Sequence, residues 1–147
     1  MESKFHKEVM SEEMSNKNSG GRNRKFDLQD RLIRFACDAI DIAESLPKSF
    51  SGNHIACQLV RSSTSPALNY GEAQAAESRN DFIHKMKICL KELRETYVCV
   101  QLILLKQWIR NDSIEAVNKE NNELISVFVT SLKTAQNRGK TPNTSKF

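Results

Sequence analysis

The chain has 147 residues, of which 39% are hydrophobic and 27% are charged, and its formal net charge is +4. Its length suits one domain with a buried core, and its composition excludes wholesale disorder. The cysteines form no CxxC pair, no signal peptide precedes them, and the apolar run at residues 97–105 is far short of the roughly 20 residues that span a bilayer. We therefore expect a cytoplasmic protein without a membrane segment.

The net positive charge lies at the two ends of the chain. Residues 1–26 carry six basic and four acidic side chains, and residues 137–147 carry three basic and no acidic ones. Residues 27–136 carry 13 basic and 14 acidic side chains. Both ends are rich in polar residues without sustained apolar periodicity, so we predict a nearly neutral folded domain between two mobile arms that could contact RNA or DNA.

The first predicted helix follows Asp27, whose carboxylate can cap its amino end. Apolar residues recur there at steps of three and four, which places them on one face of a helix. They are Leu28, Leu32, Phe35, Ala39, Ile42 and Leu46. Pro47 and Gly52 predict the end of this helix, and Asn53 is the expected cap of the next one.

The second helix must pass Pro66, which cannot donate a hydrogen bond to the carbonyl of Ser62. We predict a kinked helix whose neighbouring hydroxyl groups bond the freed carbonyls and whose small residues let another helix approach. The alternative is a true break, with Ser65 as the cap of a new helix and Pro66 as its first residue.

The third helix should begin at Ser78, which forms a capping box with Asp81. Its apolar residues keep the three-and-four spacing over about six turns. They are Ile83, Met86, Leu90, Leu93, Tyr97, Val100 and Leu104. Because residues 97–105 are apolar on nearly every side, we expect Tyr97 and Leu104 to lie at a subunit interface of a homo-oligomer.

The fourth helix should follow the break at Asn111 and end near Gln136. Its apolar face is marked by Ile114, Val117, Leu124, Phe128 and Leu132. Four amphipathic helices with short connections predict an all-α fold, an antiparallel up-and-down four-helix bundle over residues 27–136.

Two stretches of the chain carry a family resemblance: RSSTSPALNYGEA at residues 61–73 and SRNDFIHKMKICLKELRET at residues 78–96. Over residues 27–136 the chain resembles the four-helix-bundle proteins encoded by intervening sequences of large-subunit ribosomal RNA. The matching residues are Arg61, Ser62, Thr64, Ser65, Asn69, Tyr70, Glu72, Ala73, Phe82, Lys85, Lys91, Glu92, Glu95 and Thr96. The chain departs from the family pattern at Pro66, Gly71 and Cys89, and none of these removes a catalytic group.

The resemblance implies a role in binding rather than catalysis. Members of this family look like homo-oligomers, and pentamers occur among relatives that serve as accessory proteins of reverse transcriptases in diversity-generating retroelements. Those relatives bind nucleic acid and a polymerase through basic surfaces. A common Arg is replaced here by Gly71, which removes one cation from such a surface.

The residues themselves give no positive sign of an enzyme, a metal or a cofactor. A di-iron bundle needs Glu-x-x-His pairs, and the nearest approach is Asp81-x-x-His84, where Asp81 already serves the helix terminus. His54 and Cys57 share one helix face, but a half-buried pair in a bundle is the commoner outcome. We therefore predict a non-enzymatic protein without a cofactor.

One face of the third helix is the leading candidate for a nucleic-acid interface. His84, Lys87, Lys91 and Arg94 follow each other at steps of three and four, and Arg61 and Arg79 are expected to flank them. Two readings stay open: a scaffold or adaptor that contacts RNA or DNA here, and a protein-interaction module that assembles around a partner enzyme such as a reverse transcriptase. A merely solvated charged face is the plain alternative.

Three further residues lie near the kink. Asn69 and Glu72 are expected to satisfy backbone groups or to hold a subunit contact, because a buried polar pair can fix the register of packed helices. Tyr70 is expected in the core.

Overall fold

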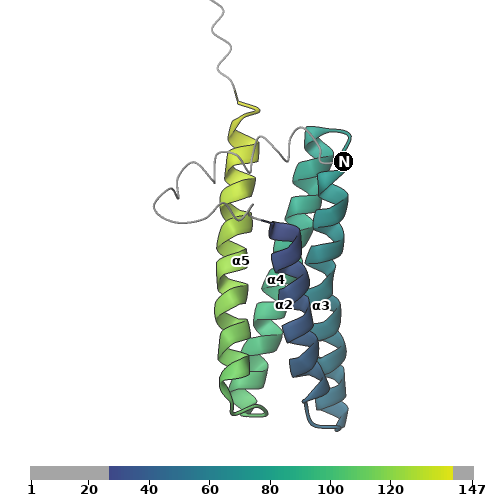
Figure 1. Cartoon of the computed structure of the whole chain (residues 1–147), viewed down its shortest axis with the longest axis vertical. Helices are drawn as coiled ribbons and strands as arrows, with labels where there is room; N and C mark the ends of the chain where they lie inside the picture. Colours follow the sequence, from purple (N-terminus) through teal and green to yellow (C-terminus); the bar gives the residue numbers. More distant parts are fainter. Residues whose placement is uncertain (1–26, 141–147) are drawn as a thin grey trace, which may run out of the picture.

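The computed structural model describes residues 27–140 and contains four helices, with no strand in that range. They are α2 (Leu28–Glu44), α3 (Phe50–Gln74), α4 (Arg79–Lys106) and α5 (Asp112–Asn137). Each helix packs against the next one along the chain, and α2 also contacts α5, so the helices close into one bundle (Figure 1). The predicted all-α, antiparallel up-and-down four-helix bundle is confirmed. The arms were predicted at residues 1–26 and 137–147. Residues 1–26 and 141–147 lie outside the described residues, and α5 ends at Asn137, inside the second predicted arm.

The helix starts follow capping rules, with one departure from the prediction. Asp27 and Ser78 cap α2 and α4 as expected, and the Ser78 hydroxyl accepts from the Asp81 amide at 3.1 Å. The prediction that Asn53 caps α3 is wrong. Ser49 does so, accepting from the amide of Gly52 at 3.1 Å, and α3 begins at Phe50.

The glycine that was expected to help end α2 instead lies inside the first turn of α3. A Cβ atom on Gly52 would come within 1.9 Å of the carbonyl oxygen of Pro47, so this turn needs a residue without a side chain. Helix α2 ends at Glu44, and Leu46 still packs into the core beyond it. The connection between α2 and α3 is therefore short, as an antiparallel pair of helices requires.

Helix α3 runs without interruption through Pro66, so the alternative of a break at Ser65 is wrong. The Thr64 hydroxyl donates to the carbonyl of Val60 at 2.8 Å, one turn before it. Ser62 and Ser63 are fully buried, and the thiol of Cys89 on α4 lies 3.5 Å from the carbonyl of Pro66. Small side chains around the proline thus allow α3 and α4 to pack closely.

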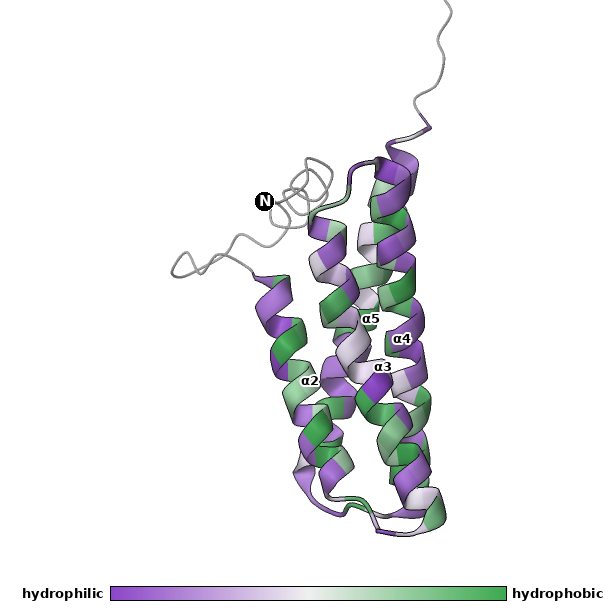
Figure 2. Ribbon diagram, turned by 90° about the vertical axis from the view of Figure 1, so that its right-hand side faces the viewer, coloured by the Kyte–Doolittle hydropathy of each residue, from purple (hydrophilic) through white to green (hydrophobic). Residues whose placement is uncertain are grey.

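The core is formed by the apolar faces of all four helices. Tyr70, expected in the core, is 1% exposed, and its ring meets that of Phe128 edge to face with centroids 6.1 Å apart. Figure 2 shows hydrophobic and hydrophilic residues alternating along every helix, as an amphipathic pattern requires. One buried polar residue, Asn121, donates to the carbonyl of Leu93 at 3.1 Å and so links α5 to α4.

An ion-pair cluster ties α2, the shortest helix, to α5. The guanidinium of Arg31 contacts Glu120 at 2.5 Å and Glu123 at 2.8 Å. The hydrogen bond and the charge of Glu120 raise the pKa of Arg31, while its partial burial lowers it. This cluster closes the bundle on the side away from the α3–α4 contact.

Candidate nucleic-acid interface

The amino-terminal half of α4 presents a row of cations to the outside, which we call the basic stripe. It consists of His84, Lys87, Lys91 and Arg94, all of them exposed. At a rise of about 1.5 Å per residue, the stripe is about 15 Å long. Within residues 27–140 none of its members forms an ion pair. These charges are therefore accessible to an anion in solution.

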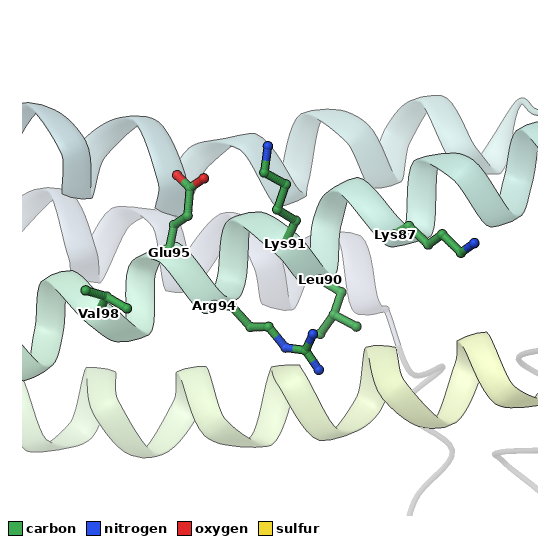
Figure 3. Close-up of a pocket in the computed structure, with 6 residues that line it drawn as sticks. All are labelled: Lys87, Leu90, Lys91, Arg94, Glu95 and Val98. Carbon is green, nitrogen blue, oxygen red and sulfur yellow. The ribbon is translucent and has the colours of Figure 1, made fainter.

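A shallow groove of about 520 Å³ accompanies the stripe. It is lined by Lys87, Leu90, Lys91, Arg94, Glu95 and Val98. Figure 3 shows Lys91 and Glu95 extending toward α3, whereas Leu90 and Arg94 extend toward α5. The groove thus combines an apolar floor with cations on both of its sides, and Glu95 is the one carboxylate among the residues that line it.

The carboxy-terminal half of α4 is different, because its outer side is apolar. Tyr97 is 39%, Val98 55%, Leu102 42% and Leu105 80% exposed. We call these four residues the apolar patch. Leu104, the other residue expected at an interface, is half-buried and packs against the core. The patch is where a second protein surface was predicted to dock, and that docking stays a prediction.

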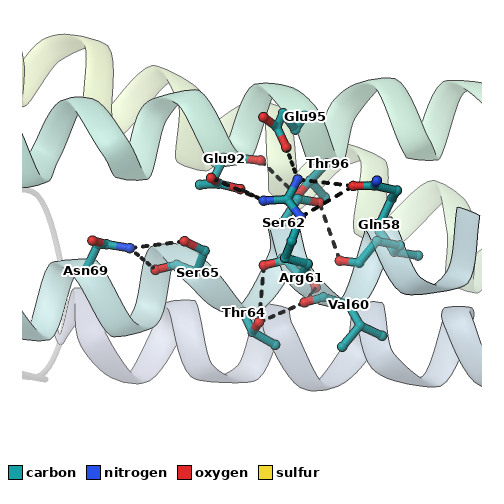
Figure 4. A network of polar contacts seen from close by, with 12 residues as sticks. Gln58, Val60, Arg61, Ser62, Thr64, Ser65, Asn69, Glu92, Glu95 and Thr96 are labelled. Atoms are coloured by element: carbon teal, nitrogen blue, oxygen red, sulfur yellow. Dashed lines mark hydrogen bonds and ion pairs between the residues drawn. The ribbon is translucent and has the colours of Figure 1, made fainter.

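Arg61, expected beside the stripe, is held within the chain instead (Figure 4). Its Nη1 lies 3.1 Å from Oε2 of Glu92, and its Nη2 contacts Glu95 and donates to Oε1 of Gln58 at 3.1 Å. The hydrogen bond to Glu95 and the charge of Glu92 raise the pKa of Arg61. The cluster joins α3 to α4 at the edge of the groove.

Arg79, the other expected flanking cation, lies in the first turn of α4 and also contacts the chain. Its guanidinium donates to the carbonyl of Ala135, in the last turns of α5. A Cβ atom on Gly139 would lie 3.2 Å from the same group. Arg79 therefore satisfies an end of α5, where carbonyl groups attract cations.

The residues near Pro66 make contacts within the bundle. Asn69 donates to both the carbonyl and the hydroxyl of Ser65 at 3.0 Å, within α3 (Figure 4). The Glu72 carboxylate accepts from Lys85 at 2.6 Å and so joins α3 to α4. Glu72 is exposed and Asn69 is half-buried, so the two residues do not form a buried polar pair, and their role at a subunit contact stays a prediction.

Sequence reasoning missed the contribution of α5 to the basic side of the molecule. From residue 124 to residue 140 the chain carries Lys133, Arg138 and Lys140 and no acidic residue. Since α5 is antiparallel to α4, this segment lies beside the amino-terminal half of α4 (Figure 1). The signal was present in the sequence as charge segregation, because the acidic residues of α5 all precede residue 124.

The cysteines and the other possible metal ligands are spread over the described residues. Between residues 27 and 140 no three His, Cys, Asp or Glu side chains are grouped so as to hold a metal ion. All four cysteines are free, and burial raises the pKa of Cys89 to about 12, which keeps its thiol protonated. In the same part of the chain, no helix is long and apolar enough to cross a membrane.

The fold and its surface together define a small antiparallel four-helix-bundle protein with a basic outer face on its third helix in sequence. Residues 24–130 match the family described as 23S rRNA-intervening sequence protein, and the chain belongs to this family. The family is tied to intervening sequences of ribosomal RNA, and its function is not established.

A solved structure supports the same assignment. It is the crystal structure of a protein of unknown function from the S23 ribosomal protein family of Bacteroides thetaiotaomicron VPI-5482. The two chains are 29% identical with a TM-score of 0.67, and the match covers 73% of this chain and 99% of that one. A comparison with curated proteins gives no match.

Proposed function

We propose that the chain is a non-enzymatic, homo-oligomeric scaffold that binds RNA or DNA through the basic stripe. The observation that supports this function is the division of the outer side of α4 into a cationic half and an apolar half. The groove beside the stripe is lined by lysine and arginine side chains with a single carboxylate, and such a lining suits an anionic partner.

The stripe suits a phosphate backbone better than a small anion. Its cations follow one helix face over about 15 Å, so one subunit can reach a few successive phosphates. Lys133 adds a cation on the neighbouring α5. Long, exposed side chains that touch phosphates give affinity without reading sequence, and this affinity falls steeply as salt rises.

The apolar patch suits a second copy of the chain. Exposed aliphatic residues on one helix face gain free energy when a partner covers them, and most assemblies of identical subunits form closed symmetric groups. Assembly would repeat the basic stripe around the oligomer, and linked weak contacts bind far more tightly than one contact alone. The resemblance to proteins that form pentamers favours a ring of this kind.

A second candidate function is a protein-interaction module that assembles around a partner enzyme such as a reverse transcriptase, without touching nucleic acid. The apolar floor of the groove, formed by Leu90 and Val98, favours it, because an apolar side chain of a protein partner would fill this floor. In either case we expect the protein to act in the cytoplasm, where its four free cysteines would stay reduced.

A salt titration separates the two functions. The whole chain is mixed with a short, labelled RNA duplex of arbitrary sequence, and the dissociation constant is measured by anisotropy from about 50 to 200 mM salt. The proposed function predicts that the logarithm of the association constant falls linearly with the logarithm of the salt concentration. The slope should be about 0.7–0.9 for each phosphate contacted. Absence of binding at the lowest salt would refute it and leave the protein-interaction module.

A further inference from the structure

The polar cluster between α3 and α4 bears on how the basic stripe stays available. We infer that Arg61 is a positioning residue: it holds the carboxylate of Glu95 against α3, which leaves Lys91 free to meet phosphate. This inference rests on the proposed function. It assigns Arg61 an indirect role, in contrast to the direct phosphate contact that its charge first indicates.

The guanidinium of Arg61 is already occupied by three acceptors of the chain (Figure 4). Its Nη1 contacts Glu92, its Nη2 contacts Glu95, and its Nε and Nη2 both point to the amide oxygen of Gln58, at 3.4 and 3.1 Å. The Arg61 side chain is 53% exposed, so a phosphate that approached it would meet the carboxylates of Glu92 and Glu95 beside it. The positive charge of Arg61 is therefore balanced by carboxylates of the chain itself.

The carboxylate of Glu95 lies where it could neutralise a cation of the basic stripe. It lines the groove together with Lys91 and Arg94, and its side chain is 38% exposed. Lys91 stands four residues before it on α4, and opposite charges at that spacing attract each other on a helix surface. Within the described residues Lys91 and Glu95 form no ion pair, and the carboxylate of Glu95 contacts Arg61 instead.

Glu92 provides an internal comparison for the same cluster. It shares the guanidinium with Glu95, but its side chain is only 10% exposed, and it does not line the groove. The two carboxylates thus hold the same cation from different places. If Arg61 were lost, Glu95 would be free to turn toward Lys91, whereas Glu92 would stay buried beside α3.

The test uses three variants of the whole chain and the RNA duplex as probe. Arg61→Gln should weaken RNA binding about three- to tenfold at low salt and lower the salt dependence by about one phosphate contact. Adding Glu95→Gln should restore both the affinity and the salt dependence of the unchanged chain. Adding Glu92→Gln instead, which makes the same change in net charge, should restore neither.

Each result has a distinct meaning. Equal weakness of both double variants would overturn the inference and assign Arg61 to direct phosphate contact, and equal recovery would overturn it in favour of overall charge. If the unchanged chain binds no RNA, the proposed function fails first, and the inference fails with it. The thermal unfolding midpoint is recorded for each variant, because Arg61→Gln leaves the buried Glu92 unpaired. If RNA affinity across the variants tracks the thermal unfolding midpoint, and not the presence of the Glu95 carboxylate, the inference is also contradicted.

Discussion

The two halves of α4 share one inner face and differ on the outer one. Toward the core, Met86 and Cys89 in the first half and Val100 and Ile103 in the second are all fully buried. Toward the outside, the first half carries the basic stripe and the second half the apolar patch. Core packing fixes the inner face of the whole helix but places no demand on the outer one, so the outer residues point to what the helix meets in solution.

The two outer surfaces should therefore be separable by mutation. Each lies on the same rigid helix, and neither contributes much to the core. A change in the stripe should alter nucleic-acid binding without altering assembly directly. A change in the patch should alter assembly first and binding only as a consequence.

The largest expected effect is reversal of charge in the stripe. In the variant Lys87→Glu, Lys91→Glu, Arg94→Glu, RNA binding at low salt should fall by about a hundredfold or more, because three phosphate contacts become repulsions. The anisotropy titration measures it, and circular dichroism should show an unchanged helical fold, since all three side chains are exposed.

A matched variant guards against a simple effect of net charge. Lys106, Arg110 and Lys119 are also exposed, but they lie at or near the connection between α4 and α5, away from the stripe. Their change to Glu alters the net charge equally and should weaken RNA binding by less than about threefold. Equal losses of RNA affinity in the two triple variants would show that RNA does not bind specifically at the basic stripe.

A smaller effect on binding is expected from the apolar patch. The variant Leu102→Asp, Leu105→Asp places two charges on the patch, so the subunits should separate, and RNA binding should weaken about ten- to a hundredfold through lost multivalency. Gel filtration and the RNA titration measure the two effects. Leu68→Asp, at a residue of α3 that is 69% exposed and outside the patch, is the control and should change neither.

The smallest effect concerns the inner face, which should be alike in both halves of α4. Cys89 lies in the first half and Cys99 in the second; both are buried, and burial raises the pKa of each thiol. Neither should react with iodoacetamide at pH 8 while the exposed Cys37 and Cys57 do so. Intact mass should therefore show two rapid additions. Rapid modification of Cys99 alone would mean that the second half of α4 opens locally.

The sequence predicts the bundle well because apolar spacing and helix caps are local signals. The spacing of Leu28, Leu32 and Phe35 directly predicts one apolar helix face, and Ser78 directly predicts a helix cap. The start of α3 was misplaced because Ser49 and Asn53 are both capping residues, and only the close fit of Gly52 against Pro47 decides between them.

The candidate site was predicted less completely, because it depends on contacts between helices. Helical spacing finds the members of the stripe on α4, but it does not show which carboxylates of α4 face α3. Arg61 was therefore counted as a flanking cation, while the packed bundle places it on Glu92 and Glu95. Lys133 was missed for the same reason, since its place beside α4 follows from the antiparallel packing of α5.

Sedimentation velocity at micromolar protein concentration tests the division of α4 most directly. The unchanged chain and the charge-reversed stripe variant should sediment as the same multi-subunit particle. The double variant Leu102→Asp, Leu105→Asp should sediment as a folded monomer. A well-folded monomer of the unchanged chain would contradict assembly through the apolar patch. It would also contradict the repetition of the basic stripe around an oligomer.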